Sequence, residues 1–273
     1  MKKNILITGS TDGIGKLTAL KLATEGHSLF LHGRNPKKLE ATIAELRKET
    51  NNKFIYGAVA DFSDLQSVRK MAKRTNLELS KLDVLINNAG VFKSSKLVNE
   101  DGLDLRLTVN YLAPYLLTRE LLPVINKAAA PRIINLSSAA QAPVSLAAIE
   151  STTKIGVQEG YAQSKLALTM WSFDFAKKQK DIDIIAVNPG SLLNTKMVKE
   201  AYGNHWSSAD KGALILYDLA VSDEFDGVTG AYFDNDKGNP RGDFGKAHAD
   251  AYNATKIEHL INTTDELLTR LGF

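Results

Sequence analysis

The chain has no cysteine among its 273 residues, which excludes disulfides, thiolate metal sites and a cysteine nucleophile. A chain without cysteine is compatible with a reducing compartment. An excess of charge is also missing: 34 basic and 31 acidic side chains leave a formal net charge of +3. We therefore expect no nucleic acid or anionic membrane surface as a partner. The five histidines are scattered, without the H-E-x-x-H pattern, so we expect no metal.

Long hydrophobic runs are missing as well. The first apolar run, Ile5-Leu6-Ile7, has three residues, whereas the core of a signal peptide needs about seven to fifteen. We find no segment near the roughly 20 apolar residues of a membrane span. A hydrophobic fraction of 44% and a charged fraction of 24% are ordinary for a globular protein. We expect a single domain over residues 1–273, in the cytoplasm.

Short apolar runs alternate along the chain with segments of helical periodicity. The expected strands are residues 4–8, 28–32, 54–59, 84–86, 132–136, 182–187 and 231–233. A long helical stretch is expected over about 103–125, with a kink at Pro114. Because the strands are apolar on both faces, we expect an α/β fold with a doubly wound parallel sheet, a Rossmann fold. Its ligands would bind at the carboxyl ends of the strands.

A glycine-rich turn, Thr8-Gly9-Ser10-Thr11-Asp12-Gly13-Ile14-Gly15, joins the first expected strand to the first helix. Its glycines have the spacing G-x-x-x-G-x-G. Such a turn lets backbone N–H groups approach a pyrophosphate at a helix N-terminus. The residues assigned to a dinucleotide here are Gly9, Thr11, Asp12, Gly13, Ile14 and Gly15.

The end of the second strand indicates which nucleotide is bound. A carboxylate there would hydrogen-bond the adenosine ribose and repel a 2′-phosphate. This chain instead has Gly33-Arg34-Asn35, and the planar fork of Arg34 suits phosphate, which predicts NADP(H). An exposed surface arginine is the alternative. Asp61 and Phe62 follow the third strand and are also assigned to the cofactor, with Asp61 near the adenine; Asp61 could equally be a helix N-cap.

Tyr161 and Lys165 are four residues apart on an expected helix and therefore share one face. A phenol titrates near pH ~10 in water, and a neighbouring ammonium favours the phenolate. Lys165 would thus bring the pKa of Tyr161 toward the range useful for proton transfer. Y-x-x-x-K alone usually marks a solvated helix face. Together with the glycine turn, it becomes a strong candidate for a catalytic pair.

With these motifs in this order, the chain resembles the short-chain dehydrogenase/reductase family over nearly its whole length. The matching motifs are Thr8 to Gly15, Asp61, Asn87-Asn88-Ala89-Gly90, Asn110, Ser138, Tyr161 with Lys165, and Asn188-Pro189-Gly190. Residues 109–118 look most like the retinol-dehydrogenase-like branch. The resemblance implies an NADP(H)-dependent enzyme that interconverts a hydrophobic aldehyde or ketone with the corresponding alcohol.

The resemblance also implies roles for single residues. Tyr161 would be the general acid in carbonyl reduction, and Lys165 would bind the nicotinamide ribose. Ser138 would hold the substrate oxygen, and Asn110 would anchor a water on the proton path. The remaining cofactor contacts would be Asn88, Ala89, Gly90, Pro189, Gly190 and Thr195.

Each of these roles has a structural alternative. Ser137 competes with Ser138, and either serine could simply end a strand. Asn110 could be a helix-interior amide that satisfies backbone groups, and Asn87-Asn88 could only brace the loop after the fourth strand.

Two features depart from the family pattern. Tyr161 follows Ser138 by 23 residues, so this loop is about ten residues longer than usual. The extra segment, residues 145–159, could cover the substrate or decorate the surface. Thr195 also follows Gly190 by one residue more than usual, so Asn194 or Thr195 could contact the nicotinamide. A substrate lid is expected over about 191–215, where an apolar pocket could be lined by Met197, Val198, Tyr202 and Trp206.

A small-molecule carbonyl or alcohol is the expected partner, and a homo-oligomer is compatible with the resemblance. A non-catalytic NADP(H)-sensing protein on the same fold is the alternative function. Such a sensor would be expected to lack the tyrosine or the lysine, and both are present. The identity of the substrate and the direction of the reaction cannot be derived from the motifs, because specificity in this fold comes from loops.

Overall fold

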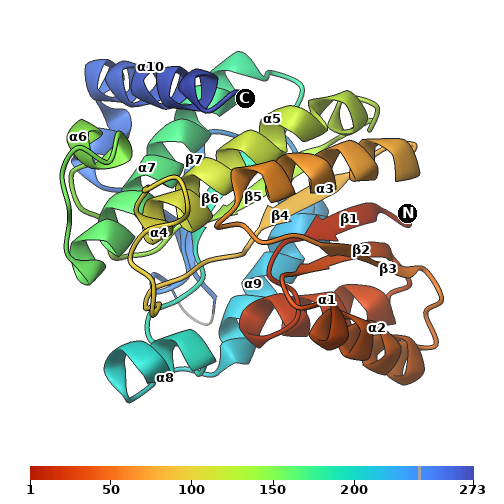
Figure 1. The fold of residues 1–273 in the computed structure, drawn as a ribbon. Helices are drawn as coiled ribbons and strands as arrows, with labels where there is room; N and C mark the ends of the chain where they lie inside the picture. Colours follow the sequence, from red (N-terminus) through yellow and green to blue (C-terminus); the bar gives the residue numbers. More distant parts are fainter. Residues whose placement is uncertain (239–240) are drawn as a thin grey trace.

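A sheet of eight strands lies between two layers of helices in the computed structural model, which describes residues 1–238 and 241–273 (Figure 1). The strand order is β3-β2-β1-β4-β5-β6-β7-β8. The strands are β1 (Asn4–Ile7), β2 (Ser28–Gly33), β3 (Ile55–Val59), β4 (Val84–Asn87), β5 (Arg132–Leu136), β6 (Asp183–Asn188), β7 (Ala231–Asp234) and β8 (Asp243–Gly245). The first seven are parallel, which confirms the predicted doubly wound fold.

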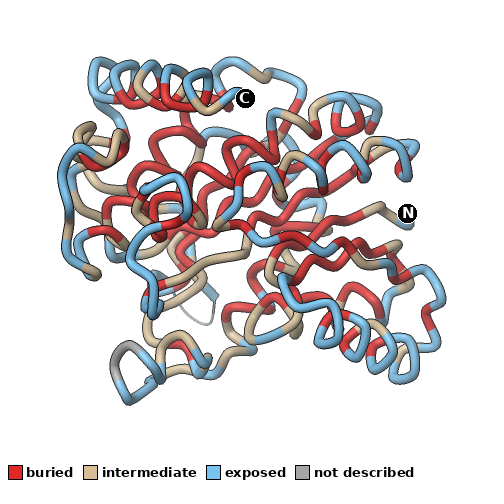
Figure 2. Tube along the Cα trace, in the orientation of Figure 1, coloured by how far each residue is buried: buried red, intermediate tan, exposed pale blue. Residues whose placement is uncertain are grey.

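Both faces of the sheet are covered, which explains the apolar character of its strands. Within β1, Leu6 belongs to the core on one face, whereas Ile5 and Ile7 belong to the core on the other. One face carries α3 (Leu65–Glu78), α5 (Ala113–Ile125) and α7 (Val157–Lys178), and α10 (Ala254–Arg270) packs outside α7; the other face carries α1 (Gly13–Thr24), α2 (Pro36–Thr50) and α9 (Ala209–Val221) (Figure 1). The buried residues accordingly follow the sheet and the inner sides of these helices (Figure 2).

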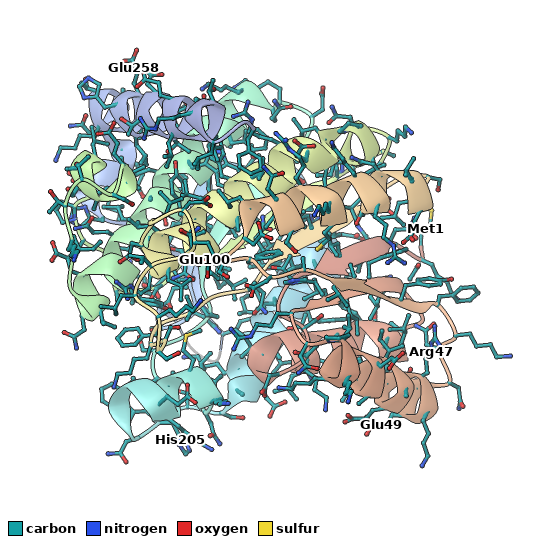
Figure 3. The ribbon with its side chains drawn as sticks, in the orientation of Figure 1. Met1, Arg47, Glu49, Glu100, His205 and Glu258 are labelled. Carbon is teal, nitrogen blue, oxygen red and sulfur yellow. The ribbon has the colours of Figure 1, made fainter. Side chains whose placement is uncertain are left out.

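Charged side chains such as Glu49 and Glu258 point outward from the helical layers (Figure 3).

Strand β8 was not predicted. It is three residues long and runs antiparallel to β7, with Phe244 opposite Phe233. Phe244 also packs edge-on against Phe233, at 5.2 Å between ring centres. So short a strand has no periodicity of its own that a sequence pattern could reveal.

The helical stretch before β5 differs from its prediction. It is divided into α4 (Leu105–Leu107), a π-helical turn (Thr108–Leu112) and α5. The irregularity therefore lies just before Pro114. Pro114 sits in the first turn of α5, which continues directly from the π-helical turn, and it has no N–H to donate to the carbonyl oxygen of Asn110, four residues earlier. The helix is therefore irregular where a disturbance by Pro114 was predicted, in the form of a wider turn around Asn110; such turns often occur at functional sites.

The extra segment, residues 145–159, contains a short helix, α6 (Leu146–Ile149). Ser145 caps this helix by accepting the N–H of Ala148 at 3.2 Å. Ala148 and Ile149 are buried in the same core as α10, beside which α6 lies (Figure 1). Part of the segment is therefore built into the core, so it is more than surface decoration.

Candidate active site

The loops after β1, β4, β5 and β6 contact one another at the carboxyl edge of the sheet. Asn88, after β4, donates its side-chain amide to the carbonyl oxygens of Thr8 and Gly9 at 2.7 and 3.0 Å. Lys165 of α7 donates to the carbonyl oxygen of Leu136, at the end of β5, at 2.6 Å. The predicted site residues from these separate motifs thus meet in one region, as the topology of a parallel sheet requires.

The glycine turn needs its glycines for steric reasons. Gly9 and Gly13 have φ angles of +65° and +53°, which favour glycine. A Cβ on Gly15 would lie 2.4 Å from Asn88 Nδ2 and 2.6 Å from the carbonyl oxygen of Gly9. Asp12 caps α1 by accepting the N–H of Gly13 at 2.8 Å. The turn is therefore closely packed against the loop after β4.

His32, at the end of β2, holds this turn in place and was not recognised from the sequence. Its Nδ1 accepts the N–H of Gly9 at 3.1 Å, and its Nε2 lies 3.0 Å from the carbonyl oxygen of Ala60. Its ring stacks on Phe62, with 4.1 Å between centres. Burial lowers the pKa of His32 to about 4, so the imidazole is neutral, with Nε2 as the donor to Ala60. A histidine inside an apolar strand was the only signal available.

Basic side chains stand at the end of β2. Arg34 is exposed there, and Asn35 caps α2 by accepting the N–H of Lys38 at 3.0 Å. The Nζ of Lys38 lies 2.6 Å from Asp12 Oδ2, which brings α2 to the glycine turn. Hydrogen bonding by Lys38 lowers the pKa of Asp12 more than burial raises it. Arg34 and Lys38 therefore place positive charge beside the turn.

Asp61 and Phe62 have separate surroundings after β3. Asp61 Oδ1 accepts the N–H and the hydroxyl of Ser63, at 2.9 and 2.8 Å. The alternative of Asp61 as a helix N-cap is wrong, because α3 begins at Leu65 and Asp64 caps it. The side chain of Phe62 is buried against His32. Only the backbone of Phe62 can therefore face a nucleotide.

The loop after β4 braces the glycine turn and leaves space at Gly90. Ala89 donates its N–H to Thr8 Oγ1 at 2.9 Å. Asn88, for which bracing this loop was the structural alternative, does hold it, through the hydrogen bonds to Thr8 and Gly9. A Cβ on Gly90 would lie 3.4 Å from Asn110 Oδ1 and 3.7 Å from both Lys165 Nζ and Met197 Cε. Side chains from three distant segments thus converge on Gly90.

Tyr161 and Lys165 lie on one face of α7. The Nζ of Lys165 is 5.6 Å from the centre of the Tyr161 ring. Lys165 is buried, and burial lowers its pKa to about 8. The Tyr161 ring is half-buried and packs against Phe92, with 4.9 Å between ring centres. A phenol and an ammonium are thus held together at the rim of the sheet.

Asn110 connects two parts of the site from within the π-helical turn. Its Oδ1 accepts the N–H of Val91 at 2.8 Å, and its Nδ2 donates to the carbonyl oxygen of Val91 at 3.0 Å. The same Nδ2 lies 3.0 Å from Ser164 Oγ, on the residue before Lys165. Asn110 therefore satisfies backbone groups, as its structural alternative stated, and it does so beside the catalytic candidates.

The two serines after β5 are in different environments. Ser137 is buried, and its hydroxyl lies 2.6 Å from Thr169 Oγ1 on α7. Ser138 is half-buried, and its Oγ accepts the N–H of Ala140 at 3.1 Å. Its carbonyl oxygen accepts hydrogen bonds from Gln141 Nε2 and the Tyr232 hydroxyl, at 2.9 and 3.0 Å. This environment favours Ser138 over Ser137 as the serine available to a substrate.

The loop after β6 leads into the lid. Gly190 has a φ of +120°, and its N–H donates to Asn188 Oδ1 at 3.2 Å. Thr195 caps α8 (Lys196–Tyr202) by accepting the N–H of Val198 at 3.3 Å. A Cβ on Gly13 would lie 3.6 Å from Thr195 Cγ2, so the lid reaches the glycine turn.

A cavity of about 460 Å³ lies between the glycine turn and the lid, a size typical of ligand sites. Its lining consists of Asp12, Gly13, Asn194, Thr195, Lys196, Lys199 and Glu200. Both residues proposed for the nicotinamide contact, Asn194 and Thr195, therefore line it. Trp206 is 80% exposed, so its predicted place in an apolar pocket is wrong. The side chain of Tyr202 lies outside the described part of the chain.

Residues 1–238 and 241–273 contain neither a metal-binding cluster nor a membrane-spanning helix. Within these ranges, histidine, aspartate and glutamate side chains form no group of three that could hold a metal ion. None of the helices in the same ranges combines the length and apolarity needed to cross a bilayer.

Known proteins share this sequence pattern and fold. A family model described as short chain dehydrogenase matches residues 3–205. Human retinol dehydrogenase 13 is 32% identical over 253 residues, covering 85% of this chain and 76% of that protein. Human polyprenol dehydrogenase is 29% identical over 256 residues, covering 85% and 76%. A short chain dehydrogenase from Shigella flexneri 2a, solved with NADP, superposes with a TM-score of 0.69 at 25% identity, covering 85% of this chain and 96% of that one.

Proposed function

The chain belongs to the short-chain dehydrogenase family, in its retinol-dehydrogenase-like branch, and we propose that it is an NADP(H)-dependent oxidoreductase. It would interconvert a hydrophobic aldehyde or ketone with the corresponding alcohol. The observation that carries the proposal is the pair Tyr161 and Lys165 on one face of α7, with the buried ammonium 5.6 Å from the phenol ring.

The residues of the carboxyl edge fit a dinucleotide cofactor. Gly9, Gly13 and Gly15 keep the turn before α1 free of side chains, so backbone N–H groups can approach a pyrophosphate. Gly90 leaves space in front of Lys165, which would bind the nicotinamide ribose. When bound, the cofactor supplies or takes up the hydride. The NADP in the structure of the Shigella flexneri relative supports a cofactor of this class.

Arg34 supports the phosphorylated form of the cofactor. It is exposed at the end of β2, and the following residue is Asn35 rather than a carboxylate. Its guanidinium can form paired hydrogen bonds to a phosphate. The ammonium of Lys38 adds positive charge nearby, although Asp12 partly neutralises it. Arg34 would thus bind the 2′-phosphate of NADP(H).

Proton transfer falls to Tyr161. In reduction, its hydroxyl would protonate the substrate oxygen as the carbonyl carbon gains hydride; in oxidation, the phenolate would take the proton back. The Lys165 ammonium favours the phenolate electrostatically. Ser138 would hold the same oxygen as negative charge develops on it. Asn110 would hold the loop at Val91 and helix α7 in fixed positions around Tyr161 and Lys165.

The class of substrate is proposed from the relatives and the lid. Two relatives are named as dehydrogenases of retinol and of polyprenol, both apolar alcohols. Met197 brings an apolar side chain within 3.7 Å of the Cβ position of Gly90. Such a side chain favours an apolar substrate beside the nicotinamide.

The test follows NADPH and NADH consumption with a panel of aldehydes, ketones and quinones. Tyr161→Phe should abolish turnover while NADPH still binds. Tyr217→Phe is the matched control, because Tyr217 lies on α9 and bonds to Glu25. NADPH-dependent turnover that survives in Tyr161→Phe, or wild-type protein that binds NADPH but reduces none of the panel, would count against the proposal.

A further inference from the structure

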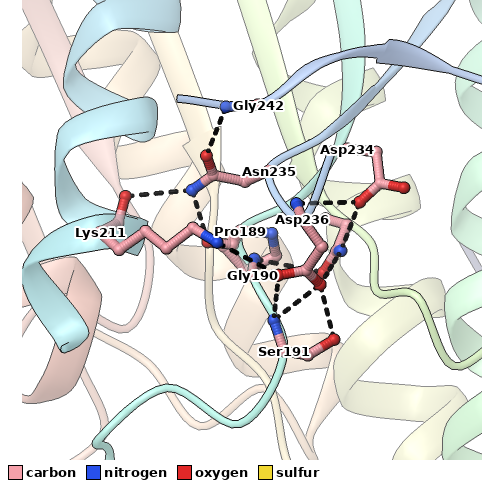
Figure 4. A network of polar contacts seen from close by, with 9 residues as sticks. Pro189, Gly190, Ser191, Lys211, Asp234, Asn235, Asp236 and Gly242 are labelled. Atoms are coloured by element: carbon pink, nitrogen blue, oxygen red, sulfur yellow. Dashed lines mark hydrogen bonds and ion pairs between the residues drawn. The ribbon is translucent and has the colours of Figure 1, made fainter. Parts of the chain in front are cut away.

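A short turn after β7 contacts both ends of the lid, residues 191–215. The carboxylate of Asp236 accepts the N–H of Ser191 at 2.9 and 3.1 Å and its hydroxyl at 2.6 Å. The same carboxylate accepts a hydrogen bond from Lys211 Nζ at 3.3 Å (Figure 4). Ser191 is the first residue of the lid and Lys211 lies near its last. One side chain therefore joins the two ends.

Asn235 makes a second connection of the same kind. Its Nδ2 donates to the carbonyl oxygens of Pro189 and Lys211, at 2.8 and 3.1 Å (Figure 4). Its Oδ1 accepts the N–H of Gly242 at 3.1 Å. The residue is buried, at 2% exposure. Both hydrogen atoms of the amide are thus used, one on each side of the lid.

The lid between these ends forms a closed loop. Asn194 donates its N–H to the carbonyl oxygen of Ser207 at 2.8 Å, and Trp206 donates to Leu192 at 2.9 Å. Helix α8 lies beyond this closure. It brings Thr195 to Gly13 and Met197 to Gly90. The base of the loop is therefore one of the contacts that position α8 over the cavity; another is the hydrogen bond from Lys93 Nζ to the carbonyl oxygen of Glu200, at 3.0 Å.

Asp236 is held as an anion. Burial alone would raise its pKa, but hydrogen bonds from Ser191, Asn188 and Lys211 outweigh burial and lower it. Asn188 Nδ2 also bridges Asp236 Oδ2 and Asp234 Oδ1, at 2.9 and 2.8 Å. These hydrogen bonds connect the turn after β7 to Asn188, the last residue of β6, and the lid begins shortly after Asn188.

We propose that Asn235 and Asp236 are positioning residues that anchor both ends of the lid and so hold α8 over the cofactor and substrate. The inference rests on the proposed function for its catalytic consequence. Its structural consequence, an ordered lid base, does not depend on any reaction. Anchoring affects how well ligands are retained and oriented more than it affects proton transfer at Tyr161.

The experiment compares wild type, Asp236→Ala, Asp236→Asn and a matched control, Asp243→Asn, whose carboxylate accepts only the N–H of the next residue, Phe244, among the described contacts. Hydrogen exchange is measured over residues 191–211 without cofactor, and KM and kcat with NADPH and the best carbonyl of the panel. In Asp236→Ala, lid amides should exchange about tenfold faster or more, since several charge-assisted bonds are lost. KM should rise about tenfold with kcat within about threefold.

Asp236→Asn keeps an acceptor for Ser191 and should fall between wild type and Asp236→Ala, and the control should match wild type. Lid exchange equal to wild type in Asp236→Ala would overturn the proposal, as would faster exchange spread equally over β6 and β7. If Asp236→Ala does not fold, Lys211→Met removes the ion pair alone and should show the same localised change. If wild type has no carbonyl turnover, the proposed function fails while the exchange result still decides the anchoring.

Discussion

The hydroxyl of Ser137 donates to the main-chain carbonyl of Lys165 at 3.2 Å, which fixes the end of β5 against the helix of the candidate catalytic pair. Ser138, the next residue, makes no such contact with α7 among the described hydrogen bonds; its Oγ accepts the N–H of Ala140. Two adjacent serines thus differ in their surroundings, one structural and one available to a ligand.

Replacing each serine by alanine should distinguish the structural role of Ser137 from the ligand-binding role proposed for Ser138. Ser138→Ala should lower kcat by about a hundredfold, because a preorganised contact to the reacting oxygen is lost, with little change in the free energy of unfolding. Ser137→Ala should cost about 1–2 kcal/mol of unfolding free energy, since Ser137 is buried and bonded. Steady-state kinetics and urea denaturation on both variants check this. A larger loss of kcat in Ser137→Ala than in Ser138→Ala would contradict this assignment.

Arg34→Gln should change the cofactor preference. Loss of a charged contact to the 2′-phosphate should weaken NADPH binding about tenfold or more. Binding of NADH, which lacks that phosphate, should be unchanged. Lys48→Gln, an exposed residue in the last turn of α2, is the control. Equal weakening for both cofactors in fluorescence titrations would show that Arg34 does not bind the phosphate.

The pH dependence of cofactor binding should reflect Lys165. Burial lowers its pKa to about 8, so the ammonium is present below that pH and lost above it. NADPH affinity should therefore decline as the pH rises through about 8, because only the ammonium retains all three donors. In Lys165→Met, affinity should be lower at neutral pH and nearly flat between pH 6.5 and 9.5. A wild-type profile as flat as that of the variant would contradict this role.

His32 should make the protein less stable in mild acid. The folded state binds the proton near pH 4, whereas the unfolded chain binds it near ~6.5. The unfolded state therefore gains protons first, and stability falls between these values, by on the order of 3 kcal/mol. Urea denaturation at pH 7.5 and 4.5 should show a smaller loss for His32→Gln. His259→Gln, exposed on α10, should behave as wild type.

The sheet followed from local sequence patterns, whereas most of the candidate site residues were named from the resemblance to a known family. All seven predicted strands exist, because buried parallel strands appear as apolar runs whatever their neighbours are. The glycine turn was also recognisable, because its spacing has a steric cause at Gly15.

What was missed depends on contacts between distant segments. His32 bonds to Gly9, 23 residues away, and Asn235 bonds to Pro189, 46 residues away. Strand β8 exists because β7 offers it an edge, and α6 because α10 covers its apolar side. None of these partners can be inferred from a window of a few residues, so the local patterns gave no indication of them.

The meeting of Leu192 with Trp206 at the base of the lid has an evolutionary consequence. A segment whose two ends are neighbours can be lengthened, shortened or exchanged without moving the sheet that carries it. Relatives could acquire different substrate specificities by exchanging the whole segment between these two positions. A designer could graft another segment between the same two positions, keeping Asn194 and Thr195 for the proposed nicotinamide contact, and leave Tyr161 and Lys165 on α7 unchanged.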